Sequence, residues 1–224
     1  TRELVVEVPG GYQNVMVFRE LHSRVRQVVL AHPDTAGIPV DVARFSGMVQ
    51  PFEPPAQHVR FLSGRFRLVN DSLRFTGVHA VLTHSRVAAR GSYALESGEL
   101  LLHLRGGPLA FTDMQWLYPA LPDRGGGSMR LRVERRPLAT RVAADQMDVA
   151  VNGGTLQGRI DIKVGDTLRI GPTSVRFANL PTEVLQRFVE DVDIPLHGRV
   201  TGRLAAEGTR HALTLDGDIR LRDD

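Results

Sequence analysis

The residues of this chain that could do chemistry match no catalytic pattern. Gly125-Gly126-Gly127-Ser128 is as rich in glycine as a phosphate-binding loop, but no Lys-Ser/Thr pair follows, and the next residues alternate like a strand. We therefore interpret this segment as a turn. The sequence has no Gly-x-Ser-x-Gly elbow and no His-Glu-x-x-His motif. It also has no cysteine, which excludes thiol catalysis, disulfides and cysteine-ligated metals.

The remaining candidates for acid–base or metal chemistry are eight histidines and scattered carboxylates. His79 and His84 are five residues apart, which places them on opposite faces of a strand and argues against a shared metal. Nothing in the spacing of the carboxylates distinguishes a catalytic pair from a solvated surface. These carboxylates are Asp145, Asp148, Glu190, Asp191 and Asp193. The sequence predicts no enzyme, no cofactor and no metal site.

The elements that would position these residues are mostly strands, because apolar and polar residues alternate from about Arg60 onwards. Short segments rich in glycine or asparagine separate the alternating runs. They are Glu96-Ser97-Gly98, Asn152-Gly153-Gly154, Gly165-Asp166, Glu207-Gly208-Thr209 and Asp216-Gly217. Turns this short join antiparallel strands, since parallel pairing needs crossovers of a dozen or more residues. The predicted fold class is mainly β, with an antiparallel sheet.

Helical spacing of apolar residues occurs in three places. The first runs from about Val17 to Leu30, although its β-branched end also fits a strand. The second covers Asp113 to Leu117, before Pro119. The third covers Thr182 to Glu190, after Pro181. We therefore expect two or three short helices.

An internal repeat organises the C-terminal part of the chain. A strand, a hairpin, a short helix, an aliphatic-Pro pair and a new strand follow one another twice, and the matching residues Gly91 and Gly158 are 67 positions apart. The predicted division is an N-terminal segment, 1–50, followed by repeating units over 51–224, approximately 85–150 and 151–224. A unit of this kind stacks on its neighbours.

Each predicted strand has one aliphatic face and one charged face, yet the expected helices are too few to cover the aliphatic faces. Two architectures explain this: a closed β-sandwich with a dry core, or one sheet curled into a trough that accepts acyl chains. The small aliphatic side chains favour the trough. We expect the following residues to line it: Val87, Ala89, Leu100, Leu102, Leu104, Met129, Leu131, Val133, Val149, Val151, Ile160, Ile162, Leu213, Leu215 and Ile219.

Composition narrows the class of protein further. The chain has 28 Lys and Arg against 25 Asp and Glu, for a net charge of +3. Its cations are spread along the whole chain and aromatic residues make up only 6%, so we expect no nucleic-acid partner. No apolar run reaches the roughly 18 residues of a membrane-spanning helix. We expect neither a membrane anchor nor a signal peptide within these residues.

Four strand and turn motifs lie along the chain. They are Gly91 after a strand, Leu-Pro-x-x-Gly-Gly-Gly at 121–127, Ile-Pro-Leu-x-Gly-x-Val-x-Gly-x-Leu-x-x-x-Gly at 194–208, and Leu-Thr-Leu-Asp-Gly-Asp-Ile-Arg-Leu at 213–221. Together these motifs resemble the AsmA-like proteins of bacterial envelopes, most closely the TamB branch. The resemblance covers roughly Asp41 to Asp224. It implies an elongated, taco-like β-groove with a hydrophobic interior.

The resemblance also implies a location and partners. Proteins of this family lie in the periplasm, anchored to the inner membrane by an N-terminal helix, and are linked to phospholipid transport between the two membranes. Phospholipid acyl chains are therefore the expected ligand, and the TamB branch adds an outer-membrane assembly protein as a partner. The chain lacks the anchoring helix and is short for the family, which fits a segment of a larger protein or a small relative.

An alternative from another class stays open: a structural or interaction β-sandwich of the cell surface with a protein partner. A stacked sheet also exposes strand edges, so we expect self-association through them. The charges of Arg220-Leu221-Arg222-Asp223-Asp224 blunt one edge, which favours the opposite edge as the contact.

Overall fold

A computed structural model describes residues 3–7, 15–28, 37–50, 56–115, 121–183, 198–209 and 211–222. Most of these residues lie in strands, namely β1 (Glu3–Glu7), β2 (Val15–Val28), β3 (Ile38–Gln50), β4 (Gln57–Val69), β5 (Ser72–Val81), β6 (Arg86–Ala94), β7 (Leu100–Ala110), β8 (Gly125–Arg136), β9 (Ala139–Val151), β10 (Gly154–Val164), β11 (Arg169–Pro181), β12 (Arg199–Thr209) and β13 (Ala212–Arg222). A 3-10 turn, η1 (Phe111–Asp113), follows β7.

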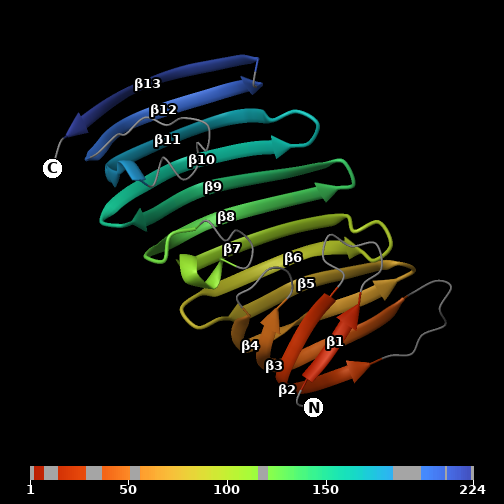
Figure 1. The fold of residues 1–224 in the computed structure, drawn as a ribbon. Helices are drawn as coiled ribbons and strands as arrows, with labels where there is room; N and C mark the ends of the chain where they lie inside the picture. The colour runs from red at the N-terminus through yellow and green to blue at the C-terminus, as the bar shows by residue number, and fades with distance from the viewer. Residues whose placement is uncertain are drawn as a thin grey trace.

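The strands form one 13-stranded sheet in which spatial order equals sequence order (Figure 1). Every neighbouring pair is antiparallel. Among the described residues β1 pairs only with β2 and β13 only with β12, so the sheet is not closed. The predicted fold class, an elongated antiparallel curled sheet, is confirmed. The sandwich alternative does not fit the described residues, because they form one sheet rather than two.

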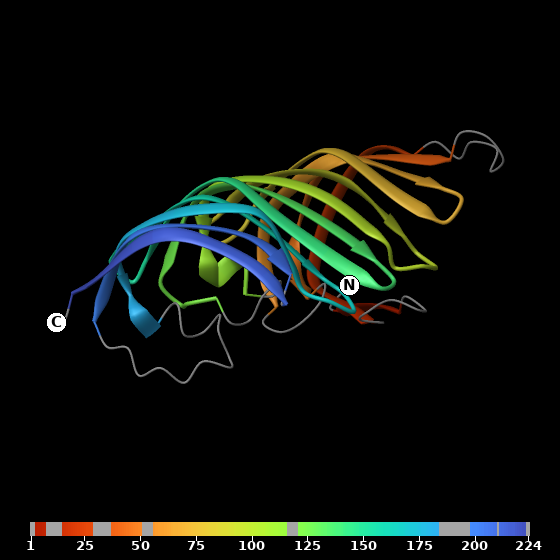
Figure 2. The ribbon, with the colours of Figure 1, turned by 90° about the horizontal axis from the view of Figure 1, so that it is seen from above.

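The sheet is strongly arched, and η1 lies under the arch (Figure 2). The inner, concave face is the apolar one, because Phe111 of η1 packs in a cluster with Val149, Val151 and Phe177 of the sheet. The outer, convex face carries the charged side chains of the alternating strands. Sequence alternation thus becomes a division between the two sides of a curved layer.

A β-bulge in strand β9 changes the spacing of the residues that face the concave side. Ala144, Met147, Val149 and Val151 are all buried, although the first two are three positions apart. The pairing of β9 shifts by one residue at this point, and Gln146 has a positive φ of 50°. This β-bulge returns Met147 to the concave face, so a strict period of two would misplace half of the strand.

The helix predicted over Val17–Leu30 is wrong. Residues 15–28 form strand β2, and residues 29 and 30 lie outside the described part of the chain. The pairing of β2 with β3 shifts between Arg19 and His22, between Arg24 and Val25, and between Val25 and Gln27. Repeated shifts interrupt the period of two, so the apolar residues recur at three- and four-residue spacing and imitate a helix.

The turn predicted at Gly125–Gly127 is also wrong, because these glycines begin β8. A Cβ on Gly126 would clash with the backbone carbonyl oxygen of Leu109, and one on Gly127 would clash with that of Asp148. Only glycine allows neighbouring strands to approach so closely here. Two other predicted turns, Glu207–Thr209 and Asp216–Gly217, likewise lie inside strands, in β12 and β13.

The two remaining predicted helices fall partly outside the described residues. Around Asp113–Leu117 the structure has the 3-10 turn Phe111–Asp113 and a turn at 114–115, whereas 116 and 117 are not described. Of Thr182–Glu190 only residues 182 and 183 are described, and they are helical. The predicted boundary at residue 50 falls between β3 and β4, which pair within the same sheet. The division into a segment and repeats stays a prediction.

Hydrogen bonds fix η1 to the rest of the sheet. The buried carboxylate of Asp113 accepts from the backbone N–H of His84 at 2.7 Å, and the hydroxyl of the buried Ser85 accepts from the backbone N–H of Ala110 at 2.8 Å. These hydrogen bonds offset the free-energy cost of removing the two polar side chains from water. The turn is therefore held on the concave face, where Phe111 covers Gly125.

Candidate functional site

One line of apolar residues crosses the concave face from β2 to β13. Residues that pair directly in antiparallel strands point to the same face, so the strand register traces this line without interruption. It consists of Val28, Val40, Phe66, Phe75, Gly91, Leu102, Val133, Val142, Ile162, Ile170, Gly208 and Leu213. We call it the central apolar row. It contains no polar or charged side chain.

The length of the row follows from strand spacing. Neighbouring strands are about 4.8 Å apart, so twelve of them give a row of roughly 50 Å along the arch. The hydrocarbon core of a bilayer is about 30 Å thick, and one acyl chain covers about half of it. The row is therefore longer than an extended acyl chain.

Gly91 interrupts the row without breaking its apolar surface. A Cβ at this position would meet the Phe75 ring at 2.8 Å, so the ring lies over the glycine. The aromatic side chain of β5 thereby supplies the surface that β6 lacks at this point. The row stays continuous from β5 to β7.

The register brings all fifteen residues predicted to line a trough to this concave face. Leu102, Val133, Ile162 and Leu213 belong to the central apolar row itself. Two adjacent rows on the same face hold six more of the predicted residues. In one row Val87 and Met129 both pair with Gly106. In the other, Ala89 pairs with Leu104, Leu104 with Leu131, and Ala144 then pairs with both Leu131 and Ile160.

Residues an even number of positions apart on a regular strand point to the same face, and so do residues that pair directly across strands. By one of these two relations, each of the other predicted lining residues lies on the face of the central apolar row. They are Leu100, Val149, Val151, Leu215 and Ile219. Leu100 lies at a boundary, because its partner on β8 is the charged Arg135.

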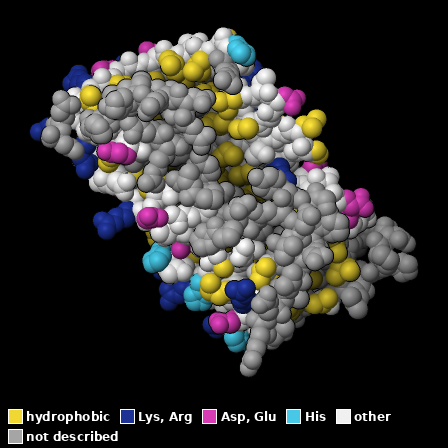
Figure 3. Space-filling model, in the orientation of Figure 1, with side chains coloured by type: hydrophobic (Ala, Val, Ile, Leu, Met, Phe, Trp, Pro, Cys, Tyr) yellow, Lys and Arg dark blue, Asp and Glu magenta, His cyan; other side chains and the backbone are white. Residues whose placement is uncertain are grey.

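Burial divides the concave face into a packed part and an open part. Val149, Val151 and Phe177 are each 3% exposed and form a hydrophobic cluster with Phe111. In contrast Val142 is 38% exposed, and the aliphatic residues of β13 are 43–60% exposed. Figure 3 shows hydrophobic side chains gathered on this side of the molecule. The exposed part could accept an apolar ligand, whereas the packed part is core.

The sequence analysis misses the aliphatic and aromatic residues of the row on β2 to β5, and also Val142 on β9 and Ile170 on β11. It places Val28 in a helix and does not include Val40, Phe66 or Phe75 in the lining. The signal was present for the last two, since Arg65-Phe66-Arg67 and Arg74-Phe75-Thr76 alternate cleanly. Alternation shows that Phe66 and Phe75 lie on the apolar faces of their strands, and only the strand register shows that both belong to the central apolar row.

Among the described residues, the convex face carries ion pairs between neighbouring strands. Arg141 of β9 makes two hydrogen bonds to Asp161 of β10, from Nε to Oδ1 at 2.8 Å and from Nη2 to Oδ2 at 2.6 Å. The hydrogen bond from Arg141 lowers the pKa of Asp161, and the same bond raises the pKa of Arg141. Both groups are therefore held in their charged forms, which suits a structural cross-strand link.

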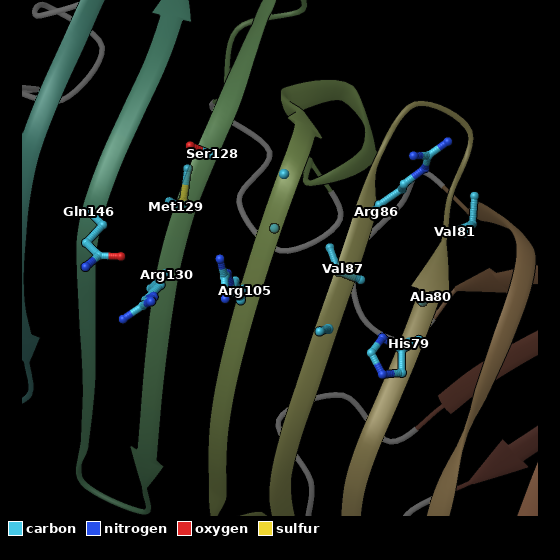
Figure 4. A pocket seen from close by; sticks show the side chains of 13 residues that line it. His79, Ala80, Val81, Arg86, Val87, Arg105, Ser128, Met129, Arg130 and Gln146 are labelled. Atoms are coloured by element: carbon cyan, nitrogen blue, oxygen red, sulfur yellow. The ribbon is translucent and has the colours of Figure 1, made fainter.

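A shallow depression of about 530 Å³ also lies on the charged side, between β5 and β9 (Figure 4). His79, Ala88, Arg105 and Arg130 are successive register partners across it. The small side chain of Ala88 does not fill the depression, and Arg86 lines one side of it. The depression is cationic and open, and no carboxylate is among its lining residues.

Within the described ranges no group of three or more His, Asp or Glu side chains could hold a metal ion. The same part of the chain contains no helix long and apolar enough to cross a membrane. In comparisons with known proteins, no family model, curated protein or solved structure matches the chain. The candidate site is therefore defined by its own geometry: an apolar face of a curved sheet that is partly open.

Proposed function

We propose that the concave face binds phospholipid acyl chains and shields them from water. The observation that carries the proposal is the central apolar row, which crosses twelve strands without a charge and leaves aliphatic side chains exposed at Val142 and along β13. Exposed apolar surface of this extent is unfavourable in water and marks a binding surface in soluble proteins.

The curvature of the sheet supports an acyl chain over a flat partner. An arch with an apolar inner face surrounds an extended chain on several sides, so more of the ligand surface is removed from water for each residue that lines the arch. The aliphatic side chains lack the hydrogen-bonding groups that would select a polar ligand. The proposed activity is non-covalent, with no catalytic step and no cofactor.

The resemblance to the AsmA-like family extends the proposal. The chain would act as a segment of a periplasmic TamB-like protein, anchored to the inner membrane in its full-length form, that carries phospholipids between the inner and outer membranes or aids outer-membrane biogenesis. An outer-membrane assembly protein is the second proposed partner. The motifs at 121–127, 194–208 and 213–221 support this part of the proposal.

Native mass spectrometry of the chain purified from bacterial cells tests lipid binding. We expect added masses of whole phospholipids on the unsubstituted chain. Val142→Asp should remove them, because a ligand that covers Val142 would have to bury a carboxylate there. Ala150→Asp is the matched control, since this exposed residue lies on the same strand and the opposite face, and it should keep the bound lipid.

Two results would contradict lipid binding on the concave face. A folded chain that carries no lipid, and takes up none from added vesicles of phosphatidylethanolamine and phosphatidylglycerol, would mean that the exposed row serves another purpose. Equal loss of lipid from Val142→Asp and Ala150→Asp would mean that binding does not involve the concave face.

A further inference from the structure

The cationic depression on the charged side of the sheet is separate from the central apolar row. It lies between β5 and β9, has a volume of about 530 Å³, and is lined by Arg86, Arg105 and Arg130 (Figure 4). A volume of this size is in the range of small-molecule sites. The groups around the depression decide which ligand it suits.

Small residues form part of the lining of the depression. Ala88 lies between its register partners, His79 on β5 and Arg105 on β7, and its methyl group leaves the space above it open. Gly106 and Gly107 follow Arg105 on β7 and also line the depression. The arginines thus border a space that the small residues between them do not fill.

The arginines of the depression have no partner in the described part of the chain. Arg86, Arg105 and Arg130 are all exposed, and none of their guanidinium groups makes a hydrogen bond or an ion pair there. Arg105 and Arg130 also lie directly opposite each other on β7 and β8. Like charges in this position repel, so an anion bound between them would stabilise the pair.

Carboxylates border the depression on one side. By register, Asp145 of β9 faces Arg130 and Asp148 faces Ser128, but neither carboxylate lines the depression. Asp148 accepts a hydrogen bond from Nε2 of Gln157 at 3.0 Å, and no ion pair joins Asp145 to Arg130 among the described residues. Because β6 and β7 contain no carboxylate, the positive charge is strongest on their side.

The surrounding strands extend this positive field. Strands β4 to β8 contain eleven arginines and one carboxylate, that of Glu134, which pairs with Arg132. Strands β9 to β13 contain nine Arg and Lys side chains and six carboxylates. The net charge of +3 therefore hides an uneven distribution. A field of one sign raises the local concentration of anions.

We propose that the depression binds the phosphate group of a phosphomonoester, held by Arg86, Arg105 and Arg130. Such a group carries a charge of about −1.5 to −2 at pH 7 and three strong acceptor oxygens. The planar fork of donors on each guanidinium matches these oxygens. A carboxylate offers one charge and two oxygens, so three arginines around one space suit a phosphate better. Ser128 and Gln146 add neutral donors to the lining.

The phosphate belongs either to a soluble molecule or to a lipid headgroup, and its chemistry at the depression is the same in both. Acyl chains on the concave face would not compete for this site, because the two faces are opposite sides of one layer of strands. The inference therefore does not depend on the proposed acyl-chain binding.

Titration with inorganic phosphate at constant ionic strength tests the site, followed by the NMR signals of the arginine Nε–H groups. We expect saturable shifts at Arg86, Arg105 and Arg130. Arg86→Gln and Arg105→Gln should each weaken phosphate binding on the order of tenfold, because each removes a charged donor. Acetate at the same ionic strength should bind clearly more weakly than phosphate.

Arg90→Gln is the matched control for Arg86→Gln. Arg90 is exposed, lies four positions along the same regular strand and on the same face, and does not line the depression. The same charge is therefore lost outside the site, and the affinity for phosphate should be nearly unchanged. Phosphate should also raise the melting temperature of the unsubstituted chain and of Arg90→Gln, but not that of Arg105→Gln.

Vesicle flotation identifies the source of the phosphate group. Phosphatidic acid has a phosphomonoester headgroup, so adding it to phosphatidylcholine vesicles should increase binding of the chain if the source is a lipid. Arg105→Gln should then remove the increase, and Val142→Asp, on the concave face, should keep it. Binding of free phosphate without any increase on phosphatidic acid would assign the site to a soluble phosphate compound.

Three results would overturn the inference. The first is the absence of saturable shifts at the three arginines. The second is equal weakening by Arg105→Gln and Arg90→Gln, which would indicate a diffuse effect of charge instead of a site. The third is acetate binding as tightly as phosphate. None of these measurements involves the concave face, so the proposed lipid binding is tested separately.

Discussion

Two substitutions on one strand separate the packed part of the concave face from its open part. Val149 and Val142 both belong to β9 and face the same side, but Val149 is 3% exposed whereas Val142 is 38% exposed. We expect Val149→Asp to unfold the protein and Val142→Asp to leave it folded. Ala150→Asp, next to Val149 on the opposite face, is the control for the cost of aspartate in a strand.

The expected magnitudes follow from burial. Removing the Val149 side chain from its cluster costs about 2 kcal/mol of transfer free energy. Burying a carboxylate among Phe111, Val151 and Phe177 adds several kcal/mol, because no partner is present for it in that cluster. The total approaches the 5–15 kcal/mol that stabilises a typical domain. At Val142 the carboxylate stays hydrated, so only the strand propensity of about 1 kcal/mol is lost.

Urea denaturation followed by far-ultraviolet circular dichroism measures both effects. We expect the midpoint of Val142→Asp to match that of Ala150→Asp, and Val149→Asp to be unfolded before urea is added. Equal destabilisation by Val142→Asp and Val149→Asp would contradict the division into a packed and an open part, because it would mean that the whole concave face is closed core. Equal tolerance of both would mean that the cluster around Phe111 does not stabilise the sheet.

The remaining predictions concern an ion pair and the turn on the concave face. Because Arg141 lowers the pKa of Asp161, the ion pair stabilises the folded protein above the pKa of the unfolded carboxylate, which is near 4. This stabilisation is lost as the pH falls through the lower pKa of the folded state. Asp161→Asn should therefore reduce the free energy of unfolding, measured by urea denaturation, by about 1 kcal/mol at pH 7 and by less at pH 3. The same reduction at both pH values would contradict a stabilising ion pair between Arg141 and Asp161. Phe111→Ala should cost about 3–5 kcal/mol and Phe111→Leu clearly less, measured by the same method. No effect of Phe111→Ala would mean that η1 is not needed to cover the cluster.

Much of the fold could be predicted because alternation is a local signal. Leu156 to Val164 alternates over the whole of β10, and its pairing with β9 and β11 follows from short turns such as Asn152-Gly153. The same parity identified concave-face residues on β6 to β10 and on β13, but none on β11 or β12. An apolar face of fixed parity is a direct consequence of side chains that alternate along a strand.

The rest could not be predicted because bulges and close strand contacts leave weak traces in a sequence. Bulges in β2 changed a period of two into a spacing that imitates a helix. The glycines at 125–127 suggested a turn, although they serve a close approach of β8 to its neighbours.

Photo-cross-linking identifies the residues that contact a bound phospholipid. A phospholipid with a diazirine at the end of one acyl chain would be bound to the chain, irradiated, and its attachment sites mapped by peptide mass spectrometry. If the concave face binds acyl chains, we expect labels on its open parts, such as Val142, Leu213 and Leu215, and none on Ala150 or Thr214 of the convex face. Labels distributed equally over both faces, or confined to the convex face, would contradict it.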